Sequence, residues 1–224
     1  IVLENVTLID NFAGGDDTRG GAIYVDNTNI DDTNRINGDD SSGGFLFEGL
    51  VLSGNQADLG AGIYIKNADV EIRRCQITGN VGETGAALYF SDAKVQLINS
   101  TVSGNFSSAP DAPGGIYTEF GSKGIFILNS IIWNNSNPQM KFDESANQMV
   151  VAYSDIGHPI ISDDILNNYT NVTINPGLET SVLLTNISND PLFITPIASN
   201  GIPTDEGNFI LQTIEAGYGA DSPC

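Results

Sequence analysis

One segment of the sequence is written twice, and this repetition limits the possible folds more than any other feature. Residues 70–80, VEIRRCQITGN, are followed by residues 95–105, VQLINSTVSGN, at an offset of 25 residues. A fixed offset of this size is typical of solenoid proteins, in which each repeat forms one coil. Apolar and polar residues alternate at the start of both copies, which indicates strands rather than helices. The sequence therefore predicts an all-β protein with the coils of a parallel β-helix.

Weaker copies of the same unit extend the repeat to both sides. The copies end at an asparagine, in the series Asn11, Asn55, Asn80, Asn105 and Asn135. A degenerate sixth copy lies at residues 153–156. A second block, in which a tyrosine follows an apolar residue, comes after the first four asparagines, at residues 21–25, 61–65, 86–90 and 114–118. We expect about five or six coils, stacked about 4.8 Å apart along the axis.

The repeat also sets the expected domain organisation. The solenoid covers residues 1–157, and its largest interruption is an insertion loop at residues 26–44. The repeat fades after this, so residues 158–224 are expected to form an irregular segment that caps and partly wraps the solenoid. The outward positions of the first strand become apolar in the late coils, at Ile98, Phe126 and Leu128. Because an apolar patch is unfavourable in water, we expect the C-terminal segment to pack on these residues.

The alternation of the two blocks resembles the repeats of polymorphic outer-membrane-type β-helix proteins, within the broader pectin-lyase-like group. Three C-terminal stretches are similar to the end of bacterial surface β-helix proteins of the choice-of-anchor Q type: residues 190–193 (DPLF), 207–212 (GNFILQ) and 222–224 (SPC). This resemblance implies a right-handed solenoid at a cell surface. In that family the Ser-Pro-Cys motif runs on into further residues, so we expect the chain to be a mature or excised fragment of a secreted protein.

The charge balance excludes some classes of partner. Lys and Arg number 8 against 28 Asp and Glu, which gives a net charge of −20. Nucleic acids and anionic membrane surfaces attract clustered positive charge, so neither is expected as a partner. No long apolar segment predicts insertion into a membrane. The acidity fits an extracellular protein in salty or calcium-containing surroundings, and it equally fits a protein that uses charge to stay soluble.

The two cysteines do not form a disulfide framework. Cys75 aligns with Leu50, Ser100 and Ser130 in a column that should point inward, so it is expected to be a small buried residue. A bridge from Cys75 to the terminal Cys224 is the less favoured alternative.

Stacking turns each repeated residue into a column along the rod. The asparagine column is expected to form a ladder of side-chain amides that stabilises the fold. The column of Glu4, Glu48 and Arg73 is the best acid–base candidate, because two carboxylates on adjacent coils would lie about 5 Å apart, as in a retaining glycosidase. The alternative for this column is a surface ion pair between Glu48 and Arg73. We assign no catalytic residue.

The acidic residues of the insertion loop are the candidate metal ligands. Asp31, Asp32, Asp39 and Asp40, with nearby asparagines, offer oxygen ligands at flexible spacing, which suits Ca²⁺. Their spacing matches no EF-hand, and a solvated polar loop is the alternative.

The tyrosines of the second block are the candidate ligand-binding residues. Tyr24, Tyr64, Tyr89 and Tyr117 alternate with inward apolar residues, so they should point outward and stack along the rod. Such a ladder suits sugar rings, whose C–H faces pack on aromatic rings. Alternatively, the stacking only stabilises the sheet.

The sequence favours a non-catalytic module of an extracellular or cell-surface protein: an adhesin, a stalk or a structural repeat. Its expected partners are a polysaccharide or other copies of the chain joined end to end. The alternative function is a polysaccharide lyase or glycoside hydrolase acting on acidic polysaccharide.

Overall fold

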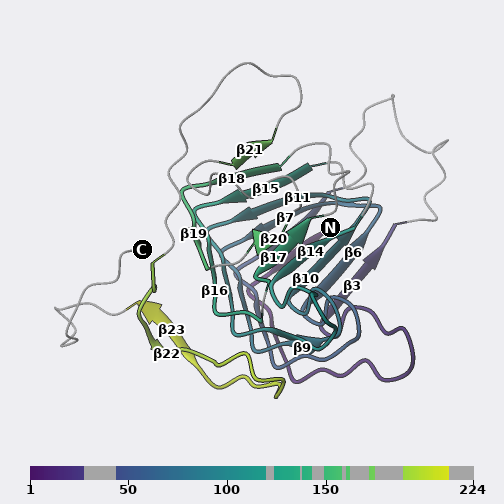
Figure 1. Ribbon diagram of the computed structural model, residues 1–224. Coiled ribbons are helices and arrows are strands. Elements are labelled where there is room, and N and C mark those ends of the chain that lie inside the picture. Colours follow the sequence, from purple (N-terminus) through teal and green to yellow (C-terminus); the bar gives the residue numbers. More distant parts are fainter. Residues whose placement is uncertain are drawn as a thin grey trace.

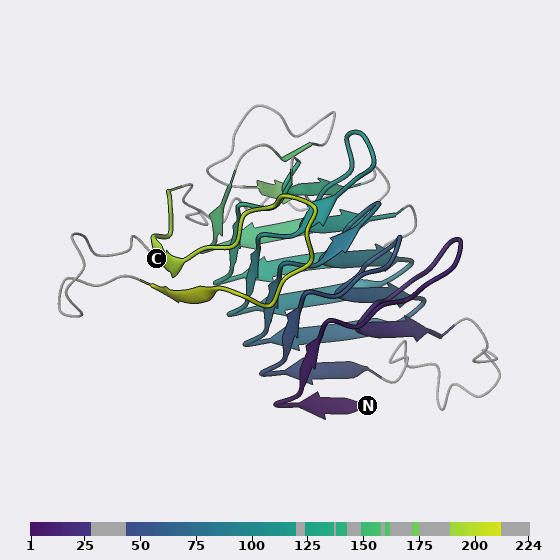
Figure 2. The same cartoon turned by 90° about the horizontal axis from the view of Figure 1, so that it is seen from below.

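The computed structural model describes residues 1–27, 44–119, 124–136, 138–142, 149–157, 160–161, 172–174 and 189–211. These residues form stacked coils, each with one strand in each of three large sheets (Figure 1). Seen from the side, the coils follow one another along the rod from the N-terminus (Figure 2). The predicted parallel β-helix is confirmed.

Neighbouring strands in the three sheets are parallel, apart from one added strand at the end of the first sheet. The first sheet contains β1 (Val2–Glu4), β4 (Phe45–Glu48), β7 (Asp69–Arg73), β11 (Lys94–Ile98), β15 (Gly124–Leu128) and β18 (Met149–Ala152). The second contains β2 (Thr7–Ile9), β5 (Val51–Ser53), β8 (Gln76–Thr78), β12 (Thr101–Ser103), β16 (Ile131–Trp133) and β19 (Asp155–Ile156). The third contains β3 (Ile23–Asp26), β6 (Ile63–Lys66), β10 (Leu88–Ser91), β14 (Ile116–Thr118), β17 (Met140–Phe142) and β20 (Ile160–Ile161). A short pair, β9 (Val81–Gly82) and β13 (Phe106–Ser107), lies between the second and third sheets.

The bend between the first and second sheets explains why the repeat carries asparagine and glycine there. One residue in each coil has a left-handed backbone, with φ between 49° and 64°. These residues are Asn5, Gly49, Arg74, Asn99, Asn129 and Tyr153. Glycine adopts this conformation without strain, and asparagine tolerates it better than most residues do. A left-handed residue at the same place in each coil turns the chain by the same angle, which keeps the coils in register.

The core is a narrow column of apolar side chains between the three sheets. In the first sheet, Phe47, Ile72, Leu97 and Ile127 stack at equivalent positions and are at most 3% exposed. The alternation of polar and apolar residues therefore has its predicted cause: one side of each strand faces this core.

The asparagine ladder is present and continuous. Side-chain amides join Asn11, Asn55, Asn80, Asn105 and Asn135 in sequence, with Nδ2–Oδ1 distances of 2.8–2.9 Å. The last member, Asn135, donates to Oε1 of Gln139 at 3.0 Å, which ends the ladder. From Asn55 on, each Oδ1 also accepts a bond from a backbone N–H of the preceding coil, and each Nδ2 also donates to a carbonyl. The buried amides are therefore satisfied by bonds that join one coil to the next.

A second ladder runs through the column that contains Cys75. The backbone N–H of Cys75 donates to Ser100 Oγ at 3.1 Å, and those of Ser100 and Ser130 donate to the next serine at 3.2 Å each. Cys75 Sγ takes the place of a serine hydroxyl and accepts from Leu50 N at 3.4 Å. Cys75 is a free, buried thiol, as expected, and burial raises its pKa. Cys224 lies outside the described residues.

The coils continue a little past residue 157. β20 pairs in parallel with β17, so the third sheet extends into the segment that was expected to be irregular. β21 (Val172–Ile174) then pairs antiparallel with β18 and adds a last strand to the first sheet. An antiparallel strand reverses the direction of the chain, so it ends the stacking of parallel strands.

Residues 189–211, here called the C-terminal strap, form an antiparallel pair of strands, β22 (Phe193–Thr195) and β23 (Asn208–Leu211), joined by a long connection. The strap runs across the second sheet (Figures 1 and 2). Asn134 Nδ2 donates to the Ile197 carbonyl at 2.7 Å, and Ser53 Oγ donates to the Thr204 carbonyl at 3.1 Å. These contacts differ from the expected packing on the first sheet, where Phe126 and Leu128 are partly exposed. At the bend after the second sheet, Gly54, Gly79 and Gly104 carry no side chain and so leave room for the strap.

Candidate functional site

The tyrosine ladder predicted from the sequence exists. Tyr24, Tyr64, Tyr89 and Tyr117 are direct neighbours across β3, β6, β10 and β14. Their ring centroids lie 5.4, 5.1 and 5.0 Å apart in sequence, and the first two pairs are nearly parallel, at 12° and 19°. The last pair is tilted by 42°. The apolar residues between them face the core, so the rings stand on the outer side of the third sheet.

Stacking leaves the rings unequally accessible. Tyr64 and Tyr89 are only 4% and 6% exposed, because each has a neighbouring ring on both faces. Gly60 and Gly85 also lie against the ladder, at 2.9 Å between the position of an added Cβ and the Cβ of Tyr89 and Tyr117. Tyr24 is 49% exposed and has a single stacking partner among the four. A sugar ring could therefore stack on Tyr24, whereas the two central rings serve the sheet.

Charged groups flank the exposed end of the ladder. Tyr24 Oη donates to a carboxylate oxygen of Asp26 at 3.2 Å, and the Arg19 guanidinium lies 5.7 Å from the centre of the Tyr64 ring. Burial is the main cause that raises the pKa of Tyr64 and, more strongly, the pKa of Tyr89, and the negative charge of Glu119 adds to both. The phenols are therefore neutral in the folded protein well above neutral pH.

The outer side of the first sheet holds the acid–base candidates. Glu4, Glu48 and Arg73 are direct neighbours in register, as predicted. The ion pairs differ from the expected pairing of Glu48 with Arg73: Glu48 pairs with Arg74, and Arg73 pairs with Glu71. The reason is the left-handed backbone of Arg74, which turns its side chain at the bend toward the preceding coil. Both arginines are substantially exposed, so each pair contributes at most about 1 kcal/mol.

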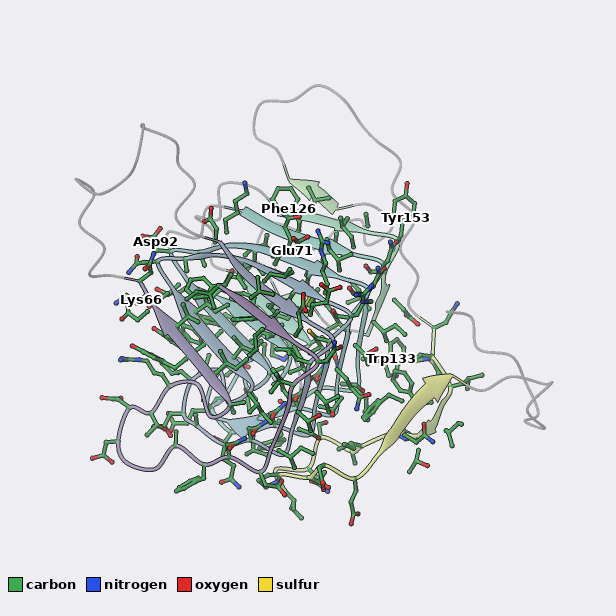
Figure 3. The ribbon with its side chains drawn as sticks, turned by 180° about the vertical axis from the view of Figure 1, so that it is seen from behind. Lys66, Glu71, Asp92, Phe126, Trp133 and Tyr153 are labelled. Carbon is green, nitrogen blue, oxygen red and sulfur yellow. The ribbon has the colours of Figure 1, made fainter. Side chains whose placement is uncertain are left out.

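A cleft of about 310 Å³ opens beside these ion pairs. Its polar lining comes from Asp69 and Glu71 on β7 and from Lys94 and Gln96 on β11. Asp69 and Lys94 are direct neighbours in the parallel register. Figure 3 shows Glu71 and Phe126 on this outer side, with Lys66 and Asp92 at the bend toward the third sheet. The sequence pattern did not single out this cleft, because its polar residues fall in two columns, Asp69 with Lys94 and Glu71 with Gln96, and neither column repeats one residue type.

The predicted calcium ligands Asp31, Asp32, Asp39 and Asp40 lie outside the described residues. Within the part of the chain that the structure describes, no cluster of three or more His, Cys, Asp or Glu residues could hold a metal ion. The same part contains no helix that is both long and apolar enough to cross a membrane.

Sequence reasoning missed the role of the glycine that precedes three of the ladder asparagines, Asn55, Asn80 and Asn105. Gly54, Gly79 and Gly104 have a left-handed backbone, and each lies under the C-terminal strap. An added Cβ at Gly104 would approach the Ile197 Cβ to 2.7 Å. The Gly-Asn pair of the repeat was a signal for a bend, but nothing in it indicated that a distant segment would pack on the glycine.

The comparison with protein families supports the fold. The family described as "Right handed beta helix region" matches residues 1–131 and, in a second overlapping match, residues 51–163. No curated protein and no solved structure is significantly similar to the chain. The family match covers more than half of the chain and coincides with the stacked coils, so the chain belongs to the right-handed β-helix family.

Proposed function

We propose that the protein is a non-catalytic β-helix module of an extracellular or cell-surface protein, a rod that serves as an adhesin, a stalk or a structural repeat. The observation that carries this proposal is the use of the repeated polar side chains. The asparagine ladder, the serine ladder and the central tyrosines all bond or stack from coil to coil. Side chains used in this way stabilise a rod and are not available to a substrate.

The acidic surface supports the same proposal. A net charge of −20 keeps a protein soluble and discourages contact with anionic partners. The resemblance of the repeats to polymorphic outer-membrane-type proteins, in the pectin-lyase-like group, favours a location at a cell surface. Self-assembly end to end belongs to the proposal too, because β1, β2 and β3 are edge strands of the three sheets in the part that the structure describes. Light scattering over a range of protein concentrations measures it.

A depolymerising enzyme is the second candidate, and the cleft on the first sheet favours it. Glu71 and Lys94 line this cleft and offer a carboxylate and an amine to a bound sugar. Against it, Glu71 is already paired with Arg73, and Glu48 with Arg74. A carboxylate that is already paired with a guanidinium is less available to a substrate, which is why the non-catalytic function is preferred.

The test is a depolymerisation assay on uronate polymers and on neutral polysaccharides, with detection of unsaturated products and of new reducing ends. We expect no turnover above a heat-denatured control. Turnover that disappears in both Glu71→Gln and Lys94→Ala, with folding intact by circular dichroism, would establish the enzyme and refute the proposal.

A further inference from the structure

The first coil has a longer loop than coils 2 and 3, and an exposed phenylalanine ring stands beside this loop. Asn11 and Tyr24 are 13 positions apart, against 9 for Asn55 and Tyr64, so the first coil has four extra residues, which lie within 14–20. Phe12, just before them, is 72% exposed. The ring Cε1 of Phe12 lies 2.6 Å from the position that a Cβ would take at Gly14. The missing side chain at Gly14 thus lets the ring lie against the backbone. A single exposed ring is not by itself a binding site, but this one stands at the edge of a cleft.

The loop is held firmly against the next coil. Thr18 N donates to a carboxylate oxygen of Asp58 at 2.7 Å, and Asp58 N donates to Thr18 Oγ1 at 2.9 Å. Backbone bonds join Ala13 N to the Gln56 carbonyl and Gly20 N to the Leu59 carbonyl, at 3.0 Å each. In Figure 2 this loop, in purple, is the first of a row of loops that project side by side from successive coils. A fixed loop loses little entropy when a ligand binds.

Phe12 stands at a cleft of about 310 Å³ that the loop forms with the following coils. The other side chains that matter for recognition are Gln56, Asp58, Glu83 and Ser108. With Phe12, they come from four successive coils, so the cleft runs along the axis of the rod. Sites for small molecules usually measure about 300–1,000 Å³, so this cleft has room for about one or two sugar rings.

The chemistry of the lining selects the ligand. Two carboxylates, an amide and a hydroxyl accept and donate hydrogen bonds as sugar hydroxyls require, and the Phe12 ring offers an apolar face for sugar C–H groups. No Lys or Arg belongs to the described lining, so an anionic sugar would meet only like charge from Asp58 and Glu83.

We propose that the Phe12 cleft binds a saccharide without negative charge, with one ring packed on Phe12 and hydroxyls bonded to Glu83 and Asp58. The proposal rests on the proposed function, which it deepens: the ladders hold the rod together, and the loop of the first coil completes a recognition cleft with side chains of the next three coils. It differs from binding on the tyrosine ladder, since Phe12 lies between β2 and β3, whereas the four stacked rings lie on strands of the third sheet.

The experiment is calorimetric titration of the full chain with neutral oligosaccharides at millimolar concentration: β-1,4-glucan, β-1,4-mannan, β-1,4-galactan and N-acetylated chitin fragments. Deacetylated chitosan fragments and oligogalacturonate form the cationic and anionic arms. We expect weak binding to at least one neutral or cationic oligosaccharide and none to oligogalacturonate. Phe12→Ala should weaken binding at least about tenfold, and Glu83→Gln several-fold.

Three more variants test whether the ligand binds in the cleft itself. Gly14→Ala keeps the Phe12 ring but displaces it, and should also weaken binding. Tyr153→Ala and Ile202→Ala remove exposed large apolar side chains elsewhere and should leave affinity unchanged. Absence of binding to every oligosaccharide, or binding that survives Phe12→Ala, overturns the proposal. Either result leaves the rod function standing, because that function fails only if the chain degrades a polysaccharide.

Discussion

Thr204 lies directly on Gly79, although 125 residues of chain separate them. Thr204 N donates to the Gly79 carbonyl at 3.2 Å, and a Cβ at Gly79 would overlap the Thr204 carbonyl oxygen. Gly79 therefore meets two requirements at once: a left-handed backbone, with φ of 62°, and close approach of the C-terminal strap. Phe193 and Ile197 of the strap are 4% and 5% exposed, so their burial depends on this approach.

Gly79→Ala is expected to destabilise the protein and loosen the strap. The left-handed backbone alone costs a non-glycine residue about 1–2 kcal/mol, and displacement of Thr204 adds to that. Gly49→Ala is the matched control, because Gly49 has a φ of 64° but its added Cβ would meet chiefly the side chain of Asn5. Thermal unfolding and limited proteolysis are the measurements. Equal melting temperatures and equal cleavage within residues 189–211 in the two variants would contradict the assigned role of Gly79.

Asn80→Ala should be among the most destabilising substitutions in the chain. Asn80 Nδ2 donates to Asn105 Oδ1 and to the Leu52 carbonyl, and its Oδ1 accepts two bonds from Asn55. Each buried group left without a partner costs about 1–3 kcal/mol. Asn11→Ala, at the partly exposed end of the ladder, should cost clearly less, because its amide makes a single bond within the ladder. Denaturant unfolding compares the two, and a similar loss in both would show that the ladder bonds contribute little.

Alkaline pH should destabilise the fold through the central tyrosines. Burial raises the pKa of Tyr64 and of Tyr89 above the ordinary value of 10.0. The unfolded chain therefore loses these protons at a lower pH than the folded chain does. The contribution of the neutral phenols to stability is complete below about pH 10 and declines as the pH rises toward the folded values.

A matched pair of variants isolates the tyrosine contribution to this pH dependence. Burial raises the pKa of Cys75 too, from an ordinary value of 9.0, so both variants carry Cys75→Ser, the residue that later coils have at this position. Addition of Tyr64→Phe and Tyr89→Phe should flatten the fall in melting temperature between about pH 9 and about pH 11. A fall of the same steepness in both variants would assign it to other groups.

Calcium binding by Asp31, Asp32, Asp39 and Asp40 stays a prediction. Millimolar Ca²⁺ should raise the melting temperature, and a chelator should lower it, because a ligand that binds only the folded state stabilises that state. Replacement of Asp31 and Asp32 by Asn should abolish the shift, whereas Asp16→Asn and Asp17→Asn in the first coil should not. An unchanged melting temperature in wild-type protein would remove the calcium hypothesis.

The sequence alone determined the architecture, because each coil must satisfy the same local rules. Alternation at Val70 and Ile72 indicated a strand with one buried side, and recurrence after 25 residues placed that side over the same core in every coil. The asparagine ladder followed directly, since residues that repeat at the same offset must stack. The same reasoning correctly predicted the stacking of the tyrosines.

Only the tertiary structure decided how accessible the stacked side chains are, which ion pairs form, and where the C-terminal strap packs. The burial of Tyr64 and Tyr89 depends on contacts with rings in both neighbouring coils. Glu48 pairs with Arg74 rather than with Arg73, because the left-handed backbone of Arg74 redirects its side chain at the bend. The position of the strap on Gly79 depends on contacts between segments without a common period. A periodic sequence specifies neighbours along the axis, whereas contacts across the outside of the rod depend on three-dimensional shape.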